Sequence, residues 1–250
     1  ITDRAGNVSS LAKTNKIYLD VTPPTMDELA PAISIVAFSN KNERGTKGTP
    51  IFKGDVPLQI KVTDPYGGSR SSGLNEVTYH LYVNGSEVAG DRQVLNPVLD
   101  TSWEENYEDP ELIFEVEHEI IVKAANHNYN DIRVVVNAKD NAGNTNTRNY
   151  ILGIDTTAPV IEVTYDNNDA QNERYFKESR VATITVTERN FSPDRIHIAT
   201  ESADISSWNY RKGNAANGDE DQWIAEIAYT ADGAYTLEIS GEDLTGQKAE

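Results

Sequence analysis

The chain has 250 residues, with 22 Lys or Arg against 40 Asp or Glu, so its formal net charge is −18. A charge this negative argues against binding to nucleic acid or to anionic lipid, because few basic side chains are present to neutralise phosphates. The chain has no cysteine, which excludes disulfides and cysteine-based zinc, iron–sulfur and thiol chemistry. No apolar run approaches the length of a membrane span.

Several segments alternate apolar and polar residues with period two, which is the pattern of a half-buried β-strand. Turn residues such as Asp-Pro, Asn-Gly and Asp-Gly separate these segments, and no stretch shows convincing helical periodicity. The many short strands predict an all-β chain built of β-sandwiches. In chain order, the expected strands are residues 58–63, 77–83, 161–165, 182–187, 223–227 and 235–239. The side chains expected to be buried are Ile60, Val62, Val77, Tyr79, Val134, Val136, Ile184, Val186, Leu237 and Ile239.

A five-residue pattern, D-x-[A/T]-G-[N/Q], occurs at residues 3–7, 140–144 and 243–247. A second pattern, Asp followed by Thr and Pro, occurs at residues 20–24 and 155–159, at a nearly fixed distance from the first. Repetition of this kind indicates tandem copies of one module. The expected boundaries are the final hairpin of a preceding module over 1–19, a complete module over 20–154, and a module lacking its last strand over 155–250.

Aligning the two longer modules by their D-x-x-G turns brings the same inward face of one strand into register. The alignment matches Ile132, Val134, Val136 and Ala138 with Tyr235, Leu237, Ile239 and Gly241, in that order. Polar, Gly-rich or acidic segments account for the remaining length, and we expect them to be inserted surface loops. These are Lys41–Lys53, Ser86–Pro110 and Glu201–Gln222.

The D-x-A-G-N turns, the D-T-T-A-P linker and Ser72-Gly73-Leu74 resemble the immunoglobulin-like repeats of large bacterial surface proteins. The resemblance covers essentially the whole chain and implies tandem immunoglobulin-like β-sandwiches. It also makes Tyr235 a candidate for the tyrosine-corner residue of such folds. Together with the absence of cysteine, it implies a bacterial cell-surface or secreted location. Its motifs are specific for the fold and say little about function, because such repeats serve as spacers, adhesin stalks and enzyme appendages.

In a sandwich of this type, the linker Asp, one strand-end carboxylate and the D-x-x-G turn meet at the pole where the module is entered. The residues expected to meet are Asp20, Asp64 and Asp140 in the first module, and Asp155, Glu188 and Asp243 in the second. Three carboxylates suit a hard cation such as Ca²⁺ at an interdomain junction. The alternative is local: the turn Asp accepts backbone hydrogen bonds and Gly supplies a positive φ. No dense D-x-D-x-D loop is present, so the sequence leaves both interpretations open and predicts no required cofactor.

Four aromatic residues of the inserted segments, Trp103, Tyr107, Trp208 and Tyr210, are candidates for stacking on sugars. The alternative is that they cover a sheet edge or fill a satellite core. The acidic run Glu104–Glu111 is expected to be a solvated loop, because nothing fixes a catalytic separation between two carboxylates. The histidines show no metal spacing, and the G-x-S-x-G and phosphate-loop motifs are absent. The sequence therefore predicts a chain that is not an enzyme.

The preferred hypothesis is a non-catalytic segment that acts as a stalk, spacer or adhesion scaffold. Its expected partners are the neighbouring modules of the same polypeptide and a host glycan or protein. The alternative is a set of accessory carbohydrate-binding modules in a carbohydrate-active enzyme or an adhesin. Lys–Asn isopeptide cross-links are left open by the sequence.

Overall fold

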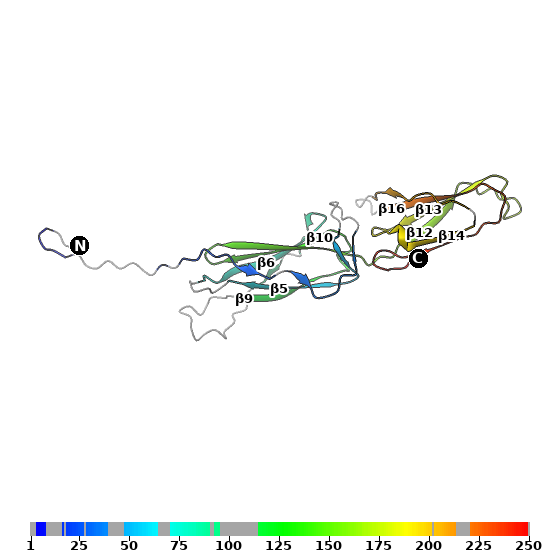
Figure 1. The fold of residues 1–250 in the computed structure, drawn as a ribbon. Helices are drawn as coiled ribbons and strands as arrows, with labels where there is room; N and C mark the ends of the chain where they lie inside the picture. Colours follow the sequence, from blue (N-terminus) through cyan, green and yellow to red (C-terminus); the bar gives the residue numbers. More distant parts are fainter. Residues whose placement is uncertain are drawn as a thin grey trace.

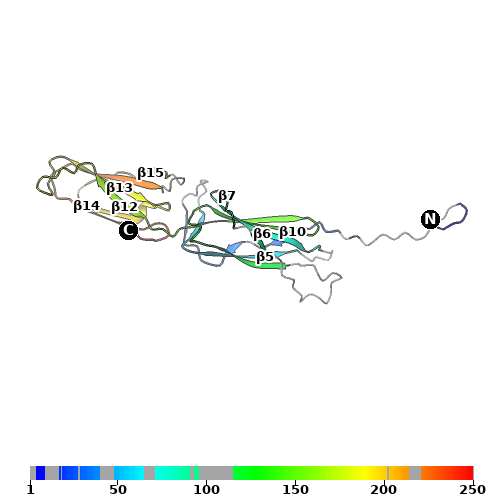
Figure 2. The same cartoon turned by 180° about the vertical axis from the view of Figure 1, so that it is seen from behind.

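The computed structural model describes residues 4–8, 17, 19–27, 29–39, 48–64, 71–90, 93–95, 115–201, 203–213 and 221–249. Within these ranges the regular structure is β-strand, apart from one 3-10 turn, η2 (Pro193–Arg195). The all-β class is therefore confirmed. The strands form two β-structured halves that lie end to end along one long axis (Figures 1 and 2). Across the described residues there is no helix with the length and hydrophobicity that a membrane crossing needs.

The first half has two sheets. In one, the central strand β5 pairs with three others; its strands are β1 (Thr25–Met26), β2 (Ala30–Pro31), β5 (Val56–Thr63) and β9 (Glu115–Val122). The other runs in the order β3-β4-β11-β10-β6-β7, with β8 also on β6. Its strands are β3 (Ala37–Phe38), β4 (Pro50–Phe52), β6 (Leu74–Val83), β7 (Ser86–Glu87), β8 (Gln93–Leu95), β10 (Ile132–Asp140) and β11 (Thr145–Ile154).

The core of the first half lies between these sheets and follows the predicted alternation. Along β5, Val56, Leu58, Ile60 and Val62 are buried while the residues between them are more exposed. β10 repeats the pattern and packs its buried valines into the same cluster. The segment Ser86–Pro110 was expected to be a loop, and this was wrong for β7 and β8, which extend the edge of the sheet by pairing with β6.

The second half contains a four-stranded sheet and a two-stranded sheet. The larger sheet has the order β12-β13-β16-β15, and its strands are β12 (Val160–Tyr165), β13 (Arg180–Thr187), β15 (Asn209–Arg211) and β16 (Gln222–Tyr229). The smaller sheet pairs β14 (Ile196–Thr200) with β17 (Leu237–Gly241). The expected loop Glu201–Gln222 is wrong at β15, which pairs with β16 across Tyr210 and Trp223.

The buried residues of the second half form their own cluster, which includes Ile184, Val186 and Ile227. The predicted burial of Leu237 and Ile239 was wrong in degree, because both are only partly buried, whereas their matched residues Val134 and Val136 are 0% exposed. In the first half β11 pairs alongside β10. The corresponding edge of β17 has no such strand among the described residues.

Tyr235 precedes β17 rather than lying in it, since the strand begins at Leu237 and not at residue 235 as expected. Its hydroxyl donates a hydrogen bond to the carbonyl oxygen of Ala231 at 2.8 Å, and its ring packs on Tyr229 with centroids 4.7 Å apart. The side chain therefore ties the approach to β17 back onto the chain that precedes it. This is the bond expected of a tyrosine corner.

Candidate functional site: two acidic clusters

The two predicted groups of carboxylates each come together. In Asp20, Asp64 and Asp140, one carboxylate oxygen from each residue lies within 4.8 Å of the others, and the same holds for Asp155, Glu188 and Asp243. The fold explains the repetition, because each group combines a linker residue, a residue that follows β5 or β13, and a residue at the end of β10 or just after β17. The clusters lie at opposite ends of β11, a strand of ten residues that spans about 30 Å.

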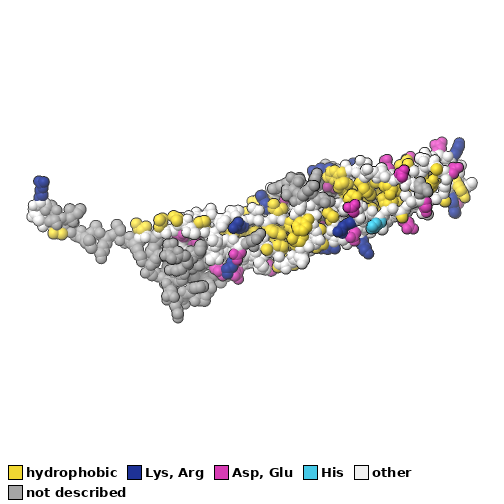
Figure 3. Space-filling model, in the orientation of Figure 1, with side chains coloured by type: hydrophobic (Ala, Val, Ile, Leu, Met, Phe, Trp, Pro, Cys, Tyr) yellow, Lys and Arg dark blue, Asp and Glu magenta, His cyan; other side chains and the backbone are white. Residues whose placement is uncertain are grey.

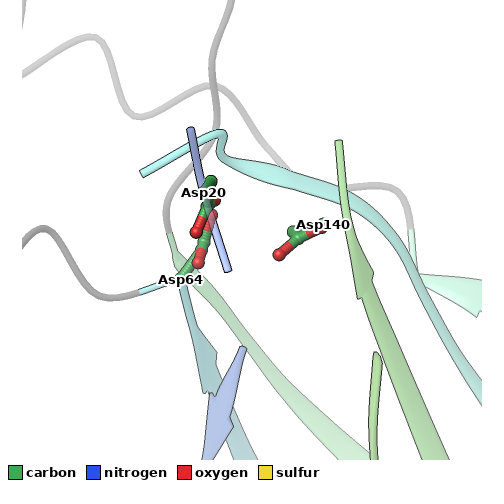
Figure 4. A group of neighbouring side chains, drawn as sticks. All are labelled: Asp20, Asp64 and Asp140. Atoms are coloured by element: carbon green, nitrogen blue, oxygen red, sulfur yellow. The ribbon is translucent and has the colours of Figure 1, made fainter. Parts of the chain in front are cut away.

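In the first cluster, Asp20 and Asp64 lie side by side and the carboxylate of Asp140 is turned toward them (Figure 4). Asp64 and Asp140 are 1% and 0% exposed, while Asp20 is partly exposed. Asp20 accepts hydrogen bonds from the backbone N–H groups of Ser72 at 2.7 Å and Thr22 at 3.1 Å. Partial burial raises the pKa of Asp20, but hydrogen bonding with the side chain of Ser72 and with the backbone of Ser72 and Thr22 outweighs it and lowers the pKa from its ordinary value.

The D-x-x-G turns adopt the local structure that their sequence predicts. Gly6, Gly143 and Gly246 have φ values of +85°, +95° and +75°, a region that glycine enters without steric cost. Asp140 accepts a hydrogen bond from the backbone N–H of Asn144 at 2.7 Å, and Asp243 accepts one from Gln247 at 2.8 Å. The turn interpretation is therefore confirmed, and it coexists with the convergence of the carboxylates.

The side-chain amide that ends each turn also fastens the linker. Nδ2 of Asn144 donates to the carbonyl oxygen of Asp20 at 3.3 Å, and Nε2 of Gln247 donates to that of Thr157 at 2.8 Å. In both halves, then, the last residue of the turn holds the chain segment that enters the half. This accounts for the presence of an amide at the fifth position of the pattern.

Asp64 differs from its neighbours because one of its oxygens lacks a partner. Oδ2 accepts a hydrogen bond from the Ser71 hydroxyl at 2.5 Å, but the buried Oδ1 has no hydrogen-bond partner. Burial raises the pKa of Asp64, the Ser71 bond opposes this, and the nearby negative charge of Asp20 raises it further. A buried carboxylate oxygen without a donor is costly, so this atom is the one position in the cluster where a ligand would relieve a deficit.

The first cluster fits a hard divalent cation. Ca²⁺ binds oxygens at 2.3–2.6 Å, so two oxygens on opposite sides of one ion are about 5 Å apart. The limit of 4.8 Å between the carboxylate oxygens is compatible with that distance. Partial exposure of Asp20 leaves a route for water ligands, which would complete the coordination of six to eight oxygens.

The carboxylates of the second cluster are bound by donors of the protein itself. Arg189 places Nη2 at 3.4 Å from Oδ1 of Asp155, and Nδ2 of Asn190 donates to Oδ2 of the same carboxylate at 2.5 Å. The hydroxyl of Thr245 lies 2.8 Å from both Oδ1 and Oδ2 of Asp243 and donates its one hydrogen between them. Among the described residues, no carboxylate oxygen of this cluster is buried without a partner.

Glu188 carries the largest electrostatic perturbation in the second cluster. It is 2% exposed, and its Oε1 accepts a hydrogen bond from the backbone N–H of Asn190 at 2.5 Å. Burial, followed by the negative charge of Asp155, raises the pKa of Glu188 to about 8. At neutral pH the cluster therefore holds this side chain mainly in its protonated form.

The sequence did not reveal that the second cluster is also the contact between the two halves. The loop between β9 and β10 supplies Asn128 and Asn130, and the loop after β13 supplies Arg189 and Asn190. Asn130 and Asn190 exchange two buried amide hydrogen bonds, at 2.7 and 3.1 Å. Arg189 donates to the carbonyl oxygen of Asn128 at 2.8 Å and to its Oδ1 at 2.9 Å. The linker from Ile154 to Asp155 runs through this network.

Of the four candidate sugar-contact residues, the structure describes Trp208 and Tyr210, which are connected through the rings of Phe191 and Trp223. Trp103 and Tyr107 lie outside the described residues. The Trp208 ring packs edge-on against Phe191 at 5.0 Å and against the core of the second half, as the satellite-core alternative predicts. Tyr210 is 50% exposed and contacts Trp223 at 4.9 Å.

Comparison of the chain with models of known protein families finds no match, and comparison with curated proteins finds no relative.

Proposed function

We propose that this chain is a non-catalytic pair of tandem immunoglobulin-like β-sandwiches that acts as a stiff spacer in a bacterial cell-surface or secreted protein. The facing sheets of the first half and the Tyr235 hydrogen bond support the fold assignment. The observation that carries the function is the polar network of Asn128, Asn130, Arg189 and Asn190 between the halves. A flexible linker needs no such network, whereas a spacer of fixed length needs its modules held at a fixed angle.

Loss of the Arg189 contacts is expected to loosen the junction. The chain has no cysteine, so Asn149→Cys and Glu226→Cys, at exposed positions in the two halves, can receive spin labels selectively. We expect a narrow distribution of distances between the labels, and a broader one in Arg189→Ala. Pulsed electron–electron double resonance measures the distance distribution in the parent chain and in the variant.

The control for this experiment is Arg174→Ala, because Arg174 is exposed and belongs to the second half. It is expected to leave the distance distribution unchanged. A broad distribution in the parent chain, or equal broadening by both substitutions, would overturn the spacer function.

We further propose that the first acidic cluster binds one divalent cation, with Ca²⁺ as the probe. The unpartnered Oδ1 of Asp64 favours it, and the partial exposure of Asp20 allows the ion to enter. Bound cation would stabilise the first half by mass action and would hold the entry segment against the ends of β5 and β10. The second cluster already holds the Arg189 guanidinium and is expected to bind the ion more weakly.

Calorimetric titration with Ca²⁺ is expected to give one ion per chain. Asp64→Asn should abolish this binding, whereas Glu188→Gln, the matched change in the second cluster, should leave it intact. In chelator, Asp64→Asn should melt at a higher temperature than the parent chain, because it removes one of three close negative charges. Two bound ions would assign the second cluster as well. No binding, with identical melting in Ca²⁺ and in chelator, would leave the turn bonds as the whole role of these carboxylates.

A further inference from the structure

The stretch of chain that leads into β3 is uncharged, apolar and exposed. No Asp, Glu, Lys or Arg occurs from residue 29 to residue 40, although 25% of the chain is charged. Four large apolar side chains lie within six residues of this stretch, and they are 39%, 40%, 45% and 56% exposed: Ile33, Ile35, Val36 and Phe38. Residues 33–38 are called the apolar strip below.

The apolar strip lies at the junction end of the first half. β3 is the outer strand of its sheet, and among the described residues it pairs only with β4. β4 in turn pairs with Gly153 and Ile154, which come just before the linker residue Asp155. Figure 3 shows hydrophobic side chains gathered on the first half near this end. The outward edge of β3 thus presents backbone N–H and C=O groups beside apolar side chains, the combination through which one strand adds to another.

The other outer strands of the first half carry charge. β9 pairs only with β5 among the described residues, and Glu115, Glu117 and Glu119 are exposed along it. Glu87 of β7 is exposed at the edge of the sheet that lies opposite β3. Charged side chains on an edge strand hinder pairing with another chain. β3 lacks this protection, so it is the edge of the first half that is suited to pairing.

A second copy of this chain is the occupant that fits the apolar strip best. Each copy has a net charge of −18, so two copies repel each other wherever their acidic side chains meet. The strip contributes no charge, and the strip of a second copy is equally uncharged and apolar. A twofold axis lets one patch serve both partners, and antiparallel pairing is the way in which two identical strand edges exchange hydrogen bonds.

We propose that two copies of this chain associate through β3, with their apolar strips paired antiparallel across a twofold axis. The two seven-stranded sheets then join into one continuous sheet. Because the strands run along the long axis of the molecule (Figure 1), the two copies point in opposite directions. A strip of this length contributes far fewer residues than the roughly 20–30 a side of a standard interface, so the dimer is weak and reversible.

The test is the concentration dependence of the mass of the 250-residue chain, measured by sedimentation equilibrium. We expect a monomer–dimer equilibrium in the parent chain, and at least tenfold weaker association in Val36→Glu, which places a charge on the apolar strip. Val94→Glu is the matched control. Val94 lies on β8, on the side of the same sheet away from β3, and is 53% exposed against 45% for Val36. Val94→Glu should associate like the parent chain.

Hydrogen exchange locates the contact. Amide exchange of residues 35–38 should slow as the protein concentration rises in the parent chain and in Val94→Glu, but not in Val36→Glu. Residues 93–95 should exchange at a rate that does not depend on concentration. Ser34→Asp is a second variant, because Ser34 is exposed and its replacement adds a charge without removing an apolar side chain. It should weaken association in the same way even if Val36→Glu lowers the melting temperature.

Four results would overturn the proposed dimer. The first is a parent chain that is still monomeric at about 1 mM. The second is equal weakening by Val36→Glu and Val94→Glu, which would assign the effect to added charge alone. The third is a mass that continues to rise beyond two chains, which a closed twofold contact does not allow. The fourth is protection of residues 35–38 that does not change with concentration, which would mean that the apolar strip is covered within one chain.

Discussion

The second half is expected to lose stability as the pH rises from about 5 to about 9, and Glu188→Gln is expected to remove most of that loss. The pKa of Glu188 is raised from 4.5 to about 8 in the folded chain, because the side chain is buried beside Asp155. The folded state therefore binds more protons than the unfolded state between these two values. The stability that the proton contributes is complete below pH 4.5 and disappears as the pH passes 8.

The slope that one such group produces is at most about 1.4 kcal/mol per pH unit, so the total effect is on the order of a few kcal/mol. Gln keeps an oxygen that can accept the hydrogen bond from the N–H of Asn190. It removes the negative charge of the ionised Glu188 side chain, which the charges of Asp155 and Asp243 disfavour. The free energy of unfolding should be measured in chelator at several pH values, since a bound cation would compete with the proton.

Glu178→Gln is the control, because Glu178 is an exposed residue of the same half. Glu178→Gln should leave the dependence of the free energy of unfolding on pH unchanged. A parent chain equally stable at pH 5 and 8.5, or a Glu188→Gln variant with the parent slope, would contradict the assignment of this titration to Glu188.

Ile184→Ala is expected to lower the free energy of unfolding of the second half by about 2–5 kcal/mol, the usual cost of emptying a core position. Ile184 lies on β13, is 0% exposed and belongs to the cluster with Val186 and Ile227. That cluster shares no residue with the core of the first half. The transition of the second half should therefore fall by roughly 10 °C or more while that of the first half stays within a few degrees.

Differential scanning calorimetry with hydrogen exchange of each half distinguishes the two transitions. Val62→Ala is the reciprocal control, because Val62 is 0% exposed on β5 of the first half. Val62→Ala should lower the transition temperature of the first half instead of that of the second half. Equal shifts of both transitions in either variant would mean that the polar junction joins the two cores into one cooperative unit.

The strands that the sequence predicted are those in which Val, Ile and Thr alternate, as in β5, β6, β12 and β13. β9 is not among the expected strands, although Glu alternates with more buried residues along its first five positions. The structure pairs these carboxylates with the neighbouring strand: Nζ of Lys61 lies 2.7 Å from Glu115 and 2.9 Å from Glu117. Charge pairs across two strands depend on register, which a local pattern does not contain.

The meeting of the carboxylates was predictable because each repeat brings a linker residue, a strand-end residue and a D-x-x-G turn to the same end of its half. The difference between the two clusters was not. It depends on Arg189 and Asn190 and on the amides of Asn128 and Asn130, which lie about 60 residues earlier in the chain. Partial exposure of Leu237 and Ile239 was missed for a related reason, since burial of one strand is decided by the strand beside it.

The unequal strand pairing at the two entry segments has a mechanical consequence. β12 follows the linker at Asp155 and pairs with β13 through six consecutive residues, whereas the segment after Asp20 pairs with β5 through two short strands, β1 and β2, of two residues each. Under tension along the long axis, force enters each half through these strands and loads their hydrogen bonds in shear. We therefore expect the first half to yield at a lower force than the second. A cation shared by Asp20, Asp64 and Asp140 would join the entry segment to both sheets where that resistance is weakest.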